Sequence, residues 1–369
     1  MLGRLRQSGC FGVLRCIQRF ISRLMCVSVF RRVKPGQLSI LLAFSLLLGG
    51  CENGPDLVHL HGSTMGTTYN IKYLADTQSL PSPEHLKSEA DRLLEEVNNQ
   101  MSTYRPDSEL SRFNQYQGTD SVPVSAQLYA VVKEAIRLNQ ITQGALDVTV
   151  GPLVNLWGFG PEGRPEVIPT EDELSARRKI VGIHHLNLTE QGIRKDVPSL
   201  YVDLSTIAKG WGVDVLADYL ATHNIDNYMV EIGGELRTSG QNLSGSAWRI
   251  AIEKPTVDKR SVQEIIEPGD MGLATSGDYR NYFEKNGVRY SHIIDPSTGK
   301  PITNKVVSVT VIDKSAMTAD GLATGLMVLG DEEGLRIAEK YEIPVLMVVK
   351  TEHGFTEVTS SAFKPYLKH

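Results

Sequence analysis

A mostly apolar run that ends at a cysteine divides this sequence into two parts. The first fifty residues carry eight Lys or Arg and no Asp or Glu, and the run Leu38–Leu48 leads through Gly49 and Gly50 to Cys51. A basic stretch, a short apolar stretch and small residues at the cut are typical of a secretory signal. The run is too short to span a bilayer comfortably. We therefore expect residues 1–50 to be a lipoprotein signal peptide and the mature chain to begin at an acylated Cys51.

Export of this kind predicts where the mature chain works. We expect it on the periplasmic side of a bacterial membrane, held by the lipid on Cys51. The inner membrane is the expectation and the outer membrane the alternative, because Glu52 is not the residue usually taken as an inner-membrane retention signal. The segment from Met25 to Cys51 is itself a normal signal length, so the start is Met1 or Met25.

Cysteine usage limits what can stabilise the mature chain. The four cysteines are Cys10, Cys16, Cys26 and Cys51, so only the acylated one is kept after cleavage. Disulfides, thiolate metal sites and a cysteine nucleophile are therefore excluded. The 319 residues from Cys51 onward must fold around an ordinary apolar core, and they are long enough to do so.

The charge of the mature chain excludes one class of partner. Loss of the eight basic residues leaves 30 basic against 43 acidic residues, a net charge of −13. Such a surface repels the phosphate backbone of nucleic acid, which we exclude as a partner. An anion that binds this chain must be held by a local site or by a metal.

The pattern of apolar residues predicts an α+β fold, helix-rich over 83–181 and strand-rich over 182–369. A strand is expected over 65–73, a helix from Pro83 with Ser82 as its cap, a helix over 125–143, and a capping box at Thr170–Glu173. Helices are also expected after Ser205, after Ser315 and over 331–341. Further strands are predicted over 200–204, 227–232, 248–252, 262–266, 306–312 and 344–349. Helices followed by strands favour a largely antiparallel sheet.

One motif places polar residues between a predicted strand and a predicted helix. Asp203, Ser205 and Thr206 follow the apolar strand, and Lys209 comes one turn later. Free N–H groups at a helix start attract phosphate, and a lysine adds a point charge. The alternative is an ordinary helix cap with a solvated lysine.

A second motif predicts an oxygen-ligand metal site. Asp320 and Thr324 are four residues apart within a segment of small and apolar residues, so on a helix they share a face. A carboxylate and a hydroxyl suit Mg²⁺, which keeps waters and substrate phosphates as its other ligands. The alternative is a tightly packed helix, but a buried aspartate without a partner is costly.

The best candidate for a general base is His292. It stands on a predicted strand that enters the turn Asp295-Pro-Ser-Thr-Gly299, and no other histidine of the mature chain lies in so patterned a neighbourhood. The alternative is that the segment is only a well-formed turn.

Three further segments are patterned: Gly62–Thr67, Met101–Arg105 and Gly144–Thr149. In the first two, small residues lie beside Met65 and Tyr104. Small neighbours would let a flat ring approach the backbone and stack. Core packing is the alternative for Met65 and Tyr104.

Together these motifs resemble the ApbE-type FAD:protein FMN transferases, periplasmic flavin transferases that are often lipoproteins. The resemblance also includes Glu231-Ile-Gly-Gly-Glu235 and Ala274-Thr-Ser-Gly-Asp-Tyr279, and the motifs follow one another in order along nearly all of the mature chain. It implies one flavin transferase domain over 51–369, with T-fold-like antiparallel sheets flanked by helices and FAD in a cleft.

The resemblance also implies roles for single residues. Mg²⁺, or Mn²⁺ in its place, would be held by Thr206 through its main-chain oxygen, by Asp320 and by Thr324. One position departs from some relatives, in which the residue before Thr324 is acidic; here it is Ala323. The residues expected to contact FAD are Met65, Tyr104, Ala145, Leu146, Asp147, Asp203, Lys209 and Ile294.

The implied reaction moves FMN from FAD to a threonine hydroxyl of an exported or membrane flavoprotein, such as a subunit of a membrane redox pump, and releases AMP. A hydroxyl needs a base within hydrogen-bond reach, and His292 is assigned that role, with Asp295 as its orienter. The alternatives are an FAD pyrophosphatase that yields FMN and AMP, and a non-catalytic flavin-binding lipoprotein.

Overall fold

The computed structural model describes residues 54–75, 80–160, 168–253, 262–277, 282–285 and 288–367. The chain divides into two units, Met1–Gly54 and Pro55–His369, and every helix and strand named below belongs to the second. The predicted signal peptide, residues 1–50, and the predicted lipid attachment at Cys51 lie outside the described residues.

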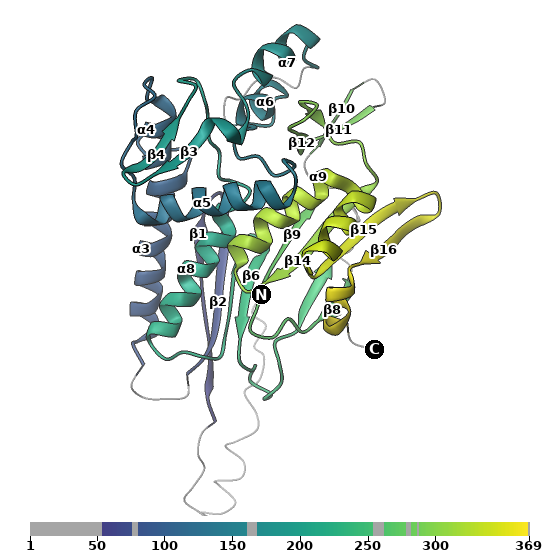
Figure 1. The fold of residues 1–369 in the computed structure, drawn as a ribbon. Coiled ribbons are helices and arrows are strands. Elements are labelled where there is room, and N and C mark those ends of the chain that lie inside the picture. Colours follow the sequence, from purple (N-terminus) through teal and green to yellow (C-terminus); the bar gives the residue numbers. More distant parts are fainter. Residues whose placement is uncertain are drawn as a thin grey trace, which may run out of the picture. The chain divides into compact units, whose positions relative to one another are not determined.

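One large antiparallel sheet runs through the second unit (Figure 1). Every pair of neighbouring strands in it is antiparallel, so the predicted α+β class with antiparallel sheet is confirmed. In the described part of the chain its strand order is β1 (Asp56–Thr64), β2 (Thr67–Ala75), β5 (Tyr228–Ile232), β6 (Glu235–Ser239), β9 (Gly272–Gly277), β14 (Val306–Asp313), β15 (Val345–Thr351) and β16 (Gly354–Thr359).

Smaller antiparallel hairpins accompany this sheet. They pair β3 (Leu186–Thr189) with β4 (Gly192–Lys195), β7 (Ile250–Glu253) with β8 (Val262–Ile266), β10 (Tyr282–Lys285) with β11 (Val288–Ser291), and β12 (Ile294–Asp295) with β13 (Lys300–Pro301).

Helices flank the large sheet. The described α-helices are α3 (Pro83–Met101), α4 (Glu109–Gln115), α5 (Ala126–Ile141), α6 (Gly151–Leu156), α7 (Glu171–Arg178), α8 (Ala208–Thr222) and α9 (Ala316–Lys340). Helix α8 packs on β5 and β6, and α9 packs on β9 and β14, so the two lie side by side on one face (Figure 1). Helices α3 and α5 pack in turn on α8 and α9. No helix in the described ranges combines the length and the apolar content needed to cross a bilayer.

Both faces of the central strands are buried, as strand β15 illustrates. Val345, Met347 and Val349 point into the core under α9, whereas Leu346 and Val348 point into a second core that includes residues of β7, β8 and the 3₁₀ turn Ser361–Tyr366. Successive residues of a strand face opposite sides, so a strand covered on both sides is an unbroken apolar run.

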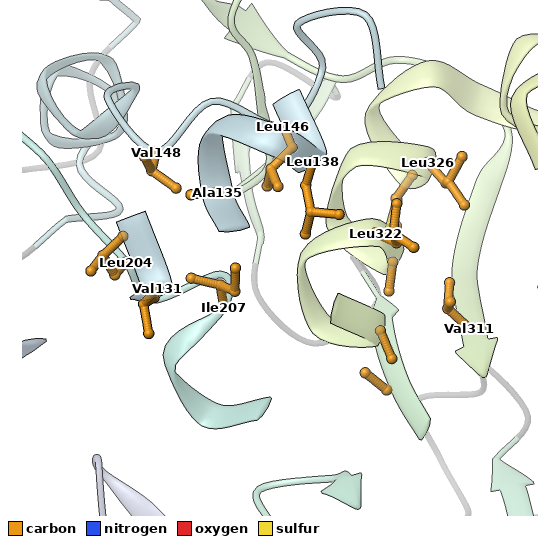
Figure 2. Close-up of a cluster of buried hydrophobic side chains, with 14 of the residues drawn as sticks. Val131, Ala135, Leu138, Leu146, Val148, Leu204, Ile207, Val311, Leu322 and Leu326 are labelled. Carbon is orange, nitrogen blue, oxygen red and sulfur yellow. The ribbon is translucent and has the colours of Figure 1, made fainter. Parts of the chain in front are cut away.

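The core under α9 joins segments far apart in the sequence. Figure 2 shows side chains from α5, from the turn after it, from the segment before α8, from β14 and from α9 in one cluster. This packing fixes the segment before α8 relative to α9, and these two segments carry most of the predicted phosphate and metal residues. The labelled members are Val131, Ala135, Leu138, Leu146, Val148, Leu204, Ile207, Val311, Leu322 and Leu326.

Several predicted helix starts are confirmed at the level of single hydrogen bonds. The hydroxyl of Ser82 accepts the N–H of His85 at 3.3 Å and so caps α3. At α7 the capping box is complete, because the Thr170 hydroxyl accepts the Glu173 N–H and the Glu173 carboxylate accepts the Thr170 N–H. These caps satisfy N–H groups that have no partner within a helix.

The structure corrects one predicted strand here and confirms two predicted helices. The strand predicted over 65–73 is the second half of a hairpin, and Met65 and Gly66 form the turn between β1 and β2 instead of lying in a strand. The two helices predicted after Ser315 and over 331–341 are both present and join as α9 across a kink at Gly330, whose φ of 82° is not helical. Glycine tolerates that positive φ, so the local signal for two helices is correct.

Candidate active site

A cavity of about 1060 Å³ lies between the β1–β2 turn, the C-terminal half of α3 with the loop after it, and the segment that leads into α8. Four of the residues predicted to contact FAD line it: Met65, Tyr104, Asp203 and Lys209. Its other lining residues are Ser63, Thr64, Gly66, Asp91, Leu94, Glu95, Val97, Asn98, Met101, Ser102, Thr103, Arg105, Ser205 and Ala208.

Met65 is held against the cavity by a two-residue hairpin turn. Its φ is 48° and that of Gly66 is 71°, the pairing of positive φ values that a type I′ turn requires. A positive φ is unusual for methionine. The side chain of Met65 packs against both neighbouring cores. An added Cβ on Gly212 of α8 would lie 3.1 Å from the Met65 methyl group, so the glycine leaves room for it.

Tyr104 supplies an aromatic ring at the cavity wall. Its side chain is 73 % exposed, which is unusual for a tyrosine in a folded domain. The loop that carries it is fixed on both sides. The Tyr104 N–H donates to the Ser102 hydroxyl at 3.2 Å, and Arg105 binds the Glu95 carboxylate with two nitrogens, at 2.6 and 2.9 Å. A ring presented in this way can stack on a planar ligand.

The segment before α8 is extended but forms no strand, contrary to the prediction for 200–204. A side chain takes the place of a neighbouring strand: the Asn114 amide donates to the Val202 carbonyl and accepts the Val202 N–H, each at 2.8 Å. The Asp203 N–H donates to the Val148 carbonyl at 2.7 Å. Asp203 is thereby anchored at the cavity edge without any sheet.

The alternative interpretation, in which Asp203, Ser205 or Thr206 is an ordinary cap of α8, is wrong. The helix begins later, at Ala208. Its N-cap residue, Ile207, has an apolar side chain and provides no capping hydrogen bond. The Asp203 carboxylate instead accepts the Ser205 N–H at 2.9 Å. The N–H of Gly210, in the first turn, donates to Asp320 on α9 at 3.0 Å. A carboxylate from a second helix thus satisfies an N–H at the positive end of α8.

Lys209 and Glu235 form a buried ion pair beside Asp320. The Lys209 ammonium lies 2.6 Å from the Glu235 carboxylate, and Glu235 is 3 % exposed. Burial disfavours the charged lysine, but the Asp320 and Glu235 carboxylates outweigh it and raise the pKa of Lys209. Burial raises the pKa of Asp320, against the opposing effects of Lys209 and the Gly210 N–H. Burial and the Asp320 charge raise the pKa of Glu235 to about 7.

Helices α8 and α9 are fixed to each other by a second carboxylate. Asp214 of α8 accepts the Ser315 hydroxyl at 2.6 Å and the N–H groups of Ala316 and Met317 at 3.0 Å each. It therefore caps α9 from outside, while Arg237 of β6 contacts it at 3.1 Å. Each helix thus receives a carboxylate from the other at its N-terminus, which holds Lys209 close to Asp320.

Glycine permits this close approach of the two helices. A Cβ on Gly210 would lie 2.3 Å from the Ala316 carbonyl oxygen, and one on Gly272 of β9 would lie 2.5 Å from the Ala316 nitrogen. Both clashes are with backbone, which cannot move aside as a side chain end does. The glycine of the Ala-Lys-Gly sequence is therefore required by packing.

Asp320, Thr206 and Thr324 carry oxygen atoms of the kind that a small divalent cation binds. The Thr206 hydroxyl is buried and has no hydrogen-bond partner among the described residues. Thr324 lies one turn after Asp320 on α9, and its hydroxyl is 3.1 Å from that of Ser276. The described residues hold no cluster of three His, Cys, Asp or Glu side chains suited to a metal. A cation here would depend on one carboxylate with hydroxyl and main-chain oxygens, as Mg²⁺ accepts.

The predicted turn Ala145–Asp147 is fixed by hydrogen bonds of Asp147 and by packing of Leu146. Asp147 accepts the N–H and the hydroxyl of Thr149, at 2.8 and 2.6 Å, and the N–H of Ile183 at 3.1 Å. Burial raises the pKa of Asp147 in spite of these bonds. Leu146 is a core residue (Figure 2), so its side chain serves packing. Ala145, Leu146 and Asp147 are not among the described residues that line the cavity.

His292 and Ile294 belong to a neighbouring aromatic cluster. His292 follows β11 and meets the ring of Phe159 edge-on, with centroids 6.3 Å apart. Ile294 is buried with Trp157 and Phe283. Neither His292 nor Ile294 belongs to the described residues that line the cavity. The structure thus brings four predicted residues together at the cavity: Met65, Tyr104, Asp203 and Lys209. Asp320 is linked to them through the Gly210 N–H, whereas the predicted base, His292, lies in a second cluster.

Sequence reasoning missed three residues that build this site: Glu235, Asp214 and Asn114. For Glu235 a signal existed, because Glu231 and Glu235 flank a Gly-Gly pair within a motif of the resemblance. Gly233 and Gly234 have φ values of 60° and 109° and form the β5–β6 turn that puts Glu235 opposite Ile232. The roles of Asp214 and Asn114 depend on contacts with distant segments, which no local pattern marks.

Fold and site together define an α+β protein with a large cavity that carries an exposed aromatic ring and an ion pair. The chain belongs to the ApbE family, which matches residues 65–347.

Its relatives carry consistent names. The "FAD:protein FMN transferase" of Vibrio cholerae is 67 % identical over 328 residues, 89 % of this chain and 98 % of the relative, and that of Haemophilus influenzae is 50 % identical over 331 residues, 88 % and 96 %. The solved structure "Flavin Transferase ApbE from Vibrio cholerae" is 67 % identical and has a TM-score of 0.80, over 85 % of this chain and all of that one.

Proposed function

We propose that this chain is an FAD:protein FMN transferase, which moves the FMN part of FAD to a threonine hydroxyl of another protein and releases AMP. Family membership supports the proposal. The observation that carries it is the buried group of Lys209, Glu235 and Asp320 beside a cavity with an exposed tyrosine ring. An aromatic surface next to buried charges suits a ligand that joins a flavin ring to phosphates.

Residues of the chain supply the binding of FAD. Tyr104 offers its ring to the flavin, and Met65 offers an apolar surface on the opposite element of the cavity. Lys209 is a cation of this site that meets a phosphate, because its side chain lines the cavity, is 32 % exposed and has a raised pKa. Asp203 is anchored at the edge of the same cavity.

Thr206, Asp320 and Thr324 are the residues that would hold Mg²⁺ or Mn²⁺. A cation bound there would neutralise charge on the phosphates and on the departing AMP. Asp320 is oriented for such a role by the Gly210 N–H, which fixes one of its two carboxylate oxygens. The Thr206 hydroxyl, which has no partner among the described residues, is a second oxygen in a buried position.

The transfer step needs no reactant other than FAD and the acceptor threonine. A bond forms between the oxygen of the acceptor threonine and the FMN phosphorus, and the anhydride bond from that phosphorus to AMP breaks. The threonine proton passes to His292, a half-buried imidazole. AMP leaves with the electron pair of the broken bond as a phosphate monoester.

The acceptor and the location are part of the same proposal. We propose an exported or membrane flavoprotein as acceptor, such as a subunit of a membrane redox pump. The sequence around Cys51 supports a lipid anchor on the periplasmic side of a bacterial membrane, which would keep enzyme and acceptor on one surface. The inner membrane is the proposed location and the outer membrane the alternative.

One incubation tests the activity. The purified protein is mixed with FAD, Mg²⁺ and the exported domain of a membrane flavoprotein, and the intact mass of the acceptor is measured. The expected result is the addition of one FMN, absent when the acceptor threonine is replaced by alanine. Free FMN and AMP with an unchanged acceptor would instead identify an FAD pyrophosphatase. Bound FAD without any product would identify a flavin-binding protein.

A further inference from the structure

Glu235 is a buried carboxylate with half of its hydrogen-bonding capacity unused. One oxygen contacts the Lys209 ammonium at 2.6 Å. The other is buried and has no hydrogen-bond partner among the described residues. Burying a charge is costly unless the charge is paired and fully hydrogen-bonded, and in the described part of the chain one oxygen of Glu235 is not. The ion pair therefore calls for a functional explanation.

The neighbouring carboxylates show what Glu235 does for Lys209. Three of them act on the ammonium: Asp320, Glu235 and Glu231. Glu231 is occupied elsewhere, because its two oxygens accept the Asn70 amide and the Gly234 N–H, each at 2.7 Å. Among the described ion pairs Lys209 contacts Glu235 and not Asp320.

Asp320 would be the natural partner of a released Lys209. It is buried, one of its oxygens is bound by the N–H of Gly210, and Gly210 is the next residue after Lys209. An ammonium attached to Asp320 would occupy a carboxylate that a divalent cation needs, and it would repel that cation. Something must hold the lysine elsewhere if Asp320 is to bind a metal.

We propose that Glu235 is a positioning residue for the cation site: by binding the Lys209 ammonium it keeps that ammonium off Asp320 and leaves the Asp320 carboxylate open to a divalent cation. This inference rests on the proposed function in so far as Asp320 holds a cation. It assigns Glu235 no contact with the reacting atoms. The Gly233-Gly234 turn fixes Glu235 at the first position of β6, so the arrangement is built into the hairpin.

The proposal makes opposite predictions for the two partners of the ion pair. Glu235→Gln keeps the shape of the side chain but weakens its hold on Lys209, so cation affinity falls. Lys209→Met removes the competing ammonium, so cation affinity is kept or increased. In the double variant the competitor is gone, and cation affinity returns toward that of the wild type. If the ion pair served only stability, the cation affinity of all three variants would fall.

The test measures binding of Mn²⁺ alone to the FAD-free protein, with free Mn²⁺ followed by electron paramagnetic resonance. A charge within a few ångströms changes the proton affinity of a carboxylate by one to three pKa units, so we expect Glu235→Gln to weaken Mn²⁺ binding about tenfold. The double variant should lie within about threefold of the wild type by the same electrostatic reasoning. Wild-type affinity in Glu235→Gln, or a double variant as weak as Glu235→Gln, would overturn the proposal.

Two further variants separate positioning from charge. Glu231→Gln removes a carboxylate from the same hairpin but no contact with Lys209, and its effect on Mn²⁺ affinity should be well below that of Glu235→Gln. Glu235→Asp keeps the charge and shortens the reach, so it should also weaken binding, and it serves if Glu235→Gln does not fold. Unchanged affinity in Glu235→Asp would contradict a positioning role.

The measurement is independent of the transfer reaction. It uses neither FAD nor acceptor, whereas the proposed function is tested by the mass of the acceptor after incubation with the wild type. A wild type that binds Mn²⁺ and shows the expected variant pattern without transferring FMN would overturn the proposed function and leave the role of Glu235 standing. If the wild type transfers FMN but Glu235→Gln binds Mn²⁺ as the wild type does, the proposed function stands and the role of Glu235 is overturned.

Discussion

The main-chain N–H of Gly210 donates a hydrogen bond of 3.0 Å to the carboxylate of Asp320, 110 residues later in the sequence. This contact links the first turn of α8 to α9 and thereby links two motifs that are separate in the chain. It uses an N–H that the helix itself cannot satisfy and orients the carboxylate at the same time. The cation site and the lysine that meets phosphate are thus parts of one helix pair.

Replacing Gly210 by alanine should separate the two helices. The new Cβ would lie 2.3 Å from the Ala316 carbonyl oxygen, so we expect a loss of about 2 kcal/mol in the free energy of unfolding, typical of overpacking, together with reduced transfer activity. Denaturant unfolding measures the first and acceptor mass the second. Gly212→Ala on the same helix is the matched control, because its Cβ would meet only side chain ends. Equal stability of the two variants would contradict the packing account.

Tyr104 should contribute to FAD binding and not to stability. Its ring is 73 % exposed, so Tyr104→Ala removes little packing, whereas the loss of stacking should weaken FAD binding by about 1 kcal/mol. Fluorescence titration with FAD measures the affinity. Tyr104→Phe keeps the ring and should bind as the wild type does. If Tyr104→Ala binds FAD with undiminished affinity, the flavin does not stack at this position.

His292→Ala should bind FAD but turn over slowly, with kcat reduced by about a hundredfold or more, the range for loss of a general base. The single-turnover rate of acceptor flavinylation measures this, and FAD titration is the control. Loss of FAD binding would instead make His292 a ligand contact or a structural residue. Its ring packs against Phe159, so unfolding must be measured on the same variant.

The fold was predictable where local patterns decide it. Ser82, Thr170 and Glu173 cap helices as their spacing indicates, and β8 and β14 begin at Val262 and Val306, as predicted. The strand expected over 200–204 fails because Asn114 provides its hydrogen bonds. The apolar content of the segment is real, but it reflects burial in the core and not pairing with another strand. A side chain that substitutes for a strand leaves no periodic signal.

The site was predictable as a set of residues but not as a geometry. Asp320 is the lone carboxylate of the small and apolar segment 315–327, and Lys209 follows a cluster of polar residues, so both stand out in the sequence. Their connection runs through Gly210, which carries no side chain. The partner of Lys209, Glu235, lies on a strand 26 residues later and contacts it only once the sheet has formed. Such contacts depend on tertiary structure.

The raised pKa of Glu235 predicts a pH dependence of stability. The folded-state value of about 7 exceeds the ordinary value of 4.5, so the folded protein holds a proton that the unfolded chain releases. Glu235 therefore contributes stability below pH 4.5 that is lost as the pH rises to about 7. Lys209 and Asp320 titrate alongside it, so the comparison must be made between variants.

Glu235→Gln removes this titration. We expect the difference in free energy of unfolding between Glu235→Gln and wild type to shift in favour of the variant as the pH rises from about 5 to about 8, measured by denaturant unfolding in the presence of a chelator. Glu231→Gln is the control, since Glu231 has hydrogen-bond partners for both of its oxygens. A difference that stays constant with pH would show that Glu235 titrates normally.

The central claim is that Asp320 binds a divalent cation which FMN transfer requires. The most direct test is the rate of acceptor flavinylation by Asp320→Asn at increasing Mg²⁺, with the unfolding transition of the variant measured beside it. Asparagine can still accept the Gly210 N–H, so the fold should persist. Transfer should fall by at least about a hundredfold, as when a group that stabilises transition-state charge is removed, and saturating Mg²⁺ should not restore it. Wild-type rates at ordinary Mg²⁺ would contradict the account.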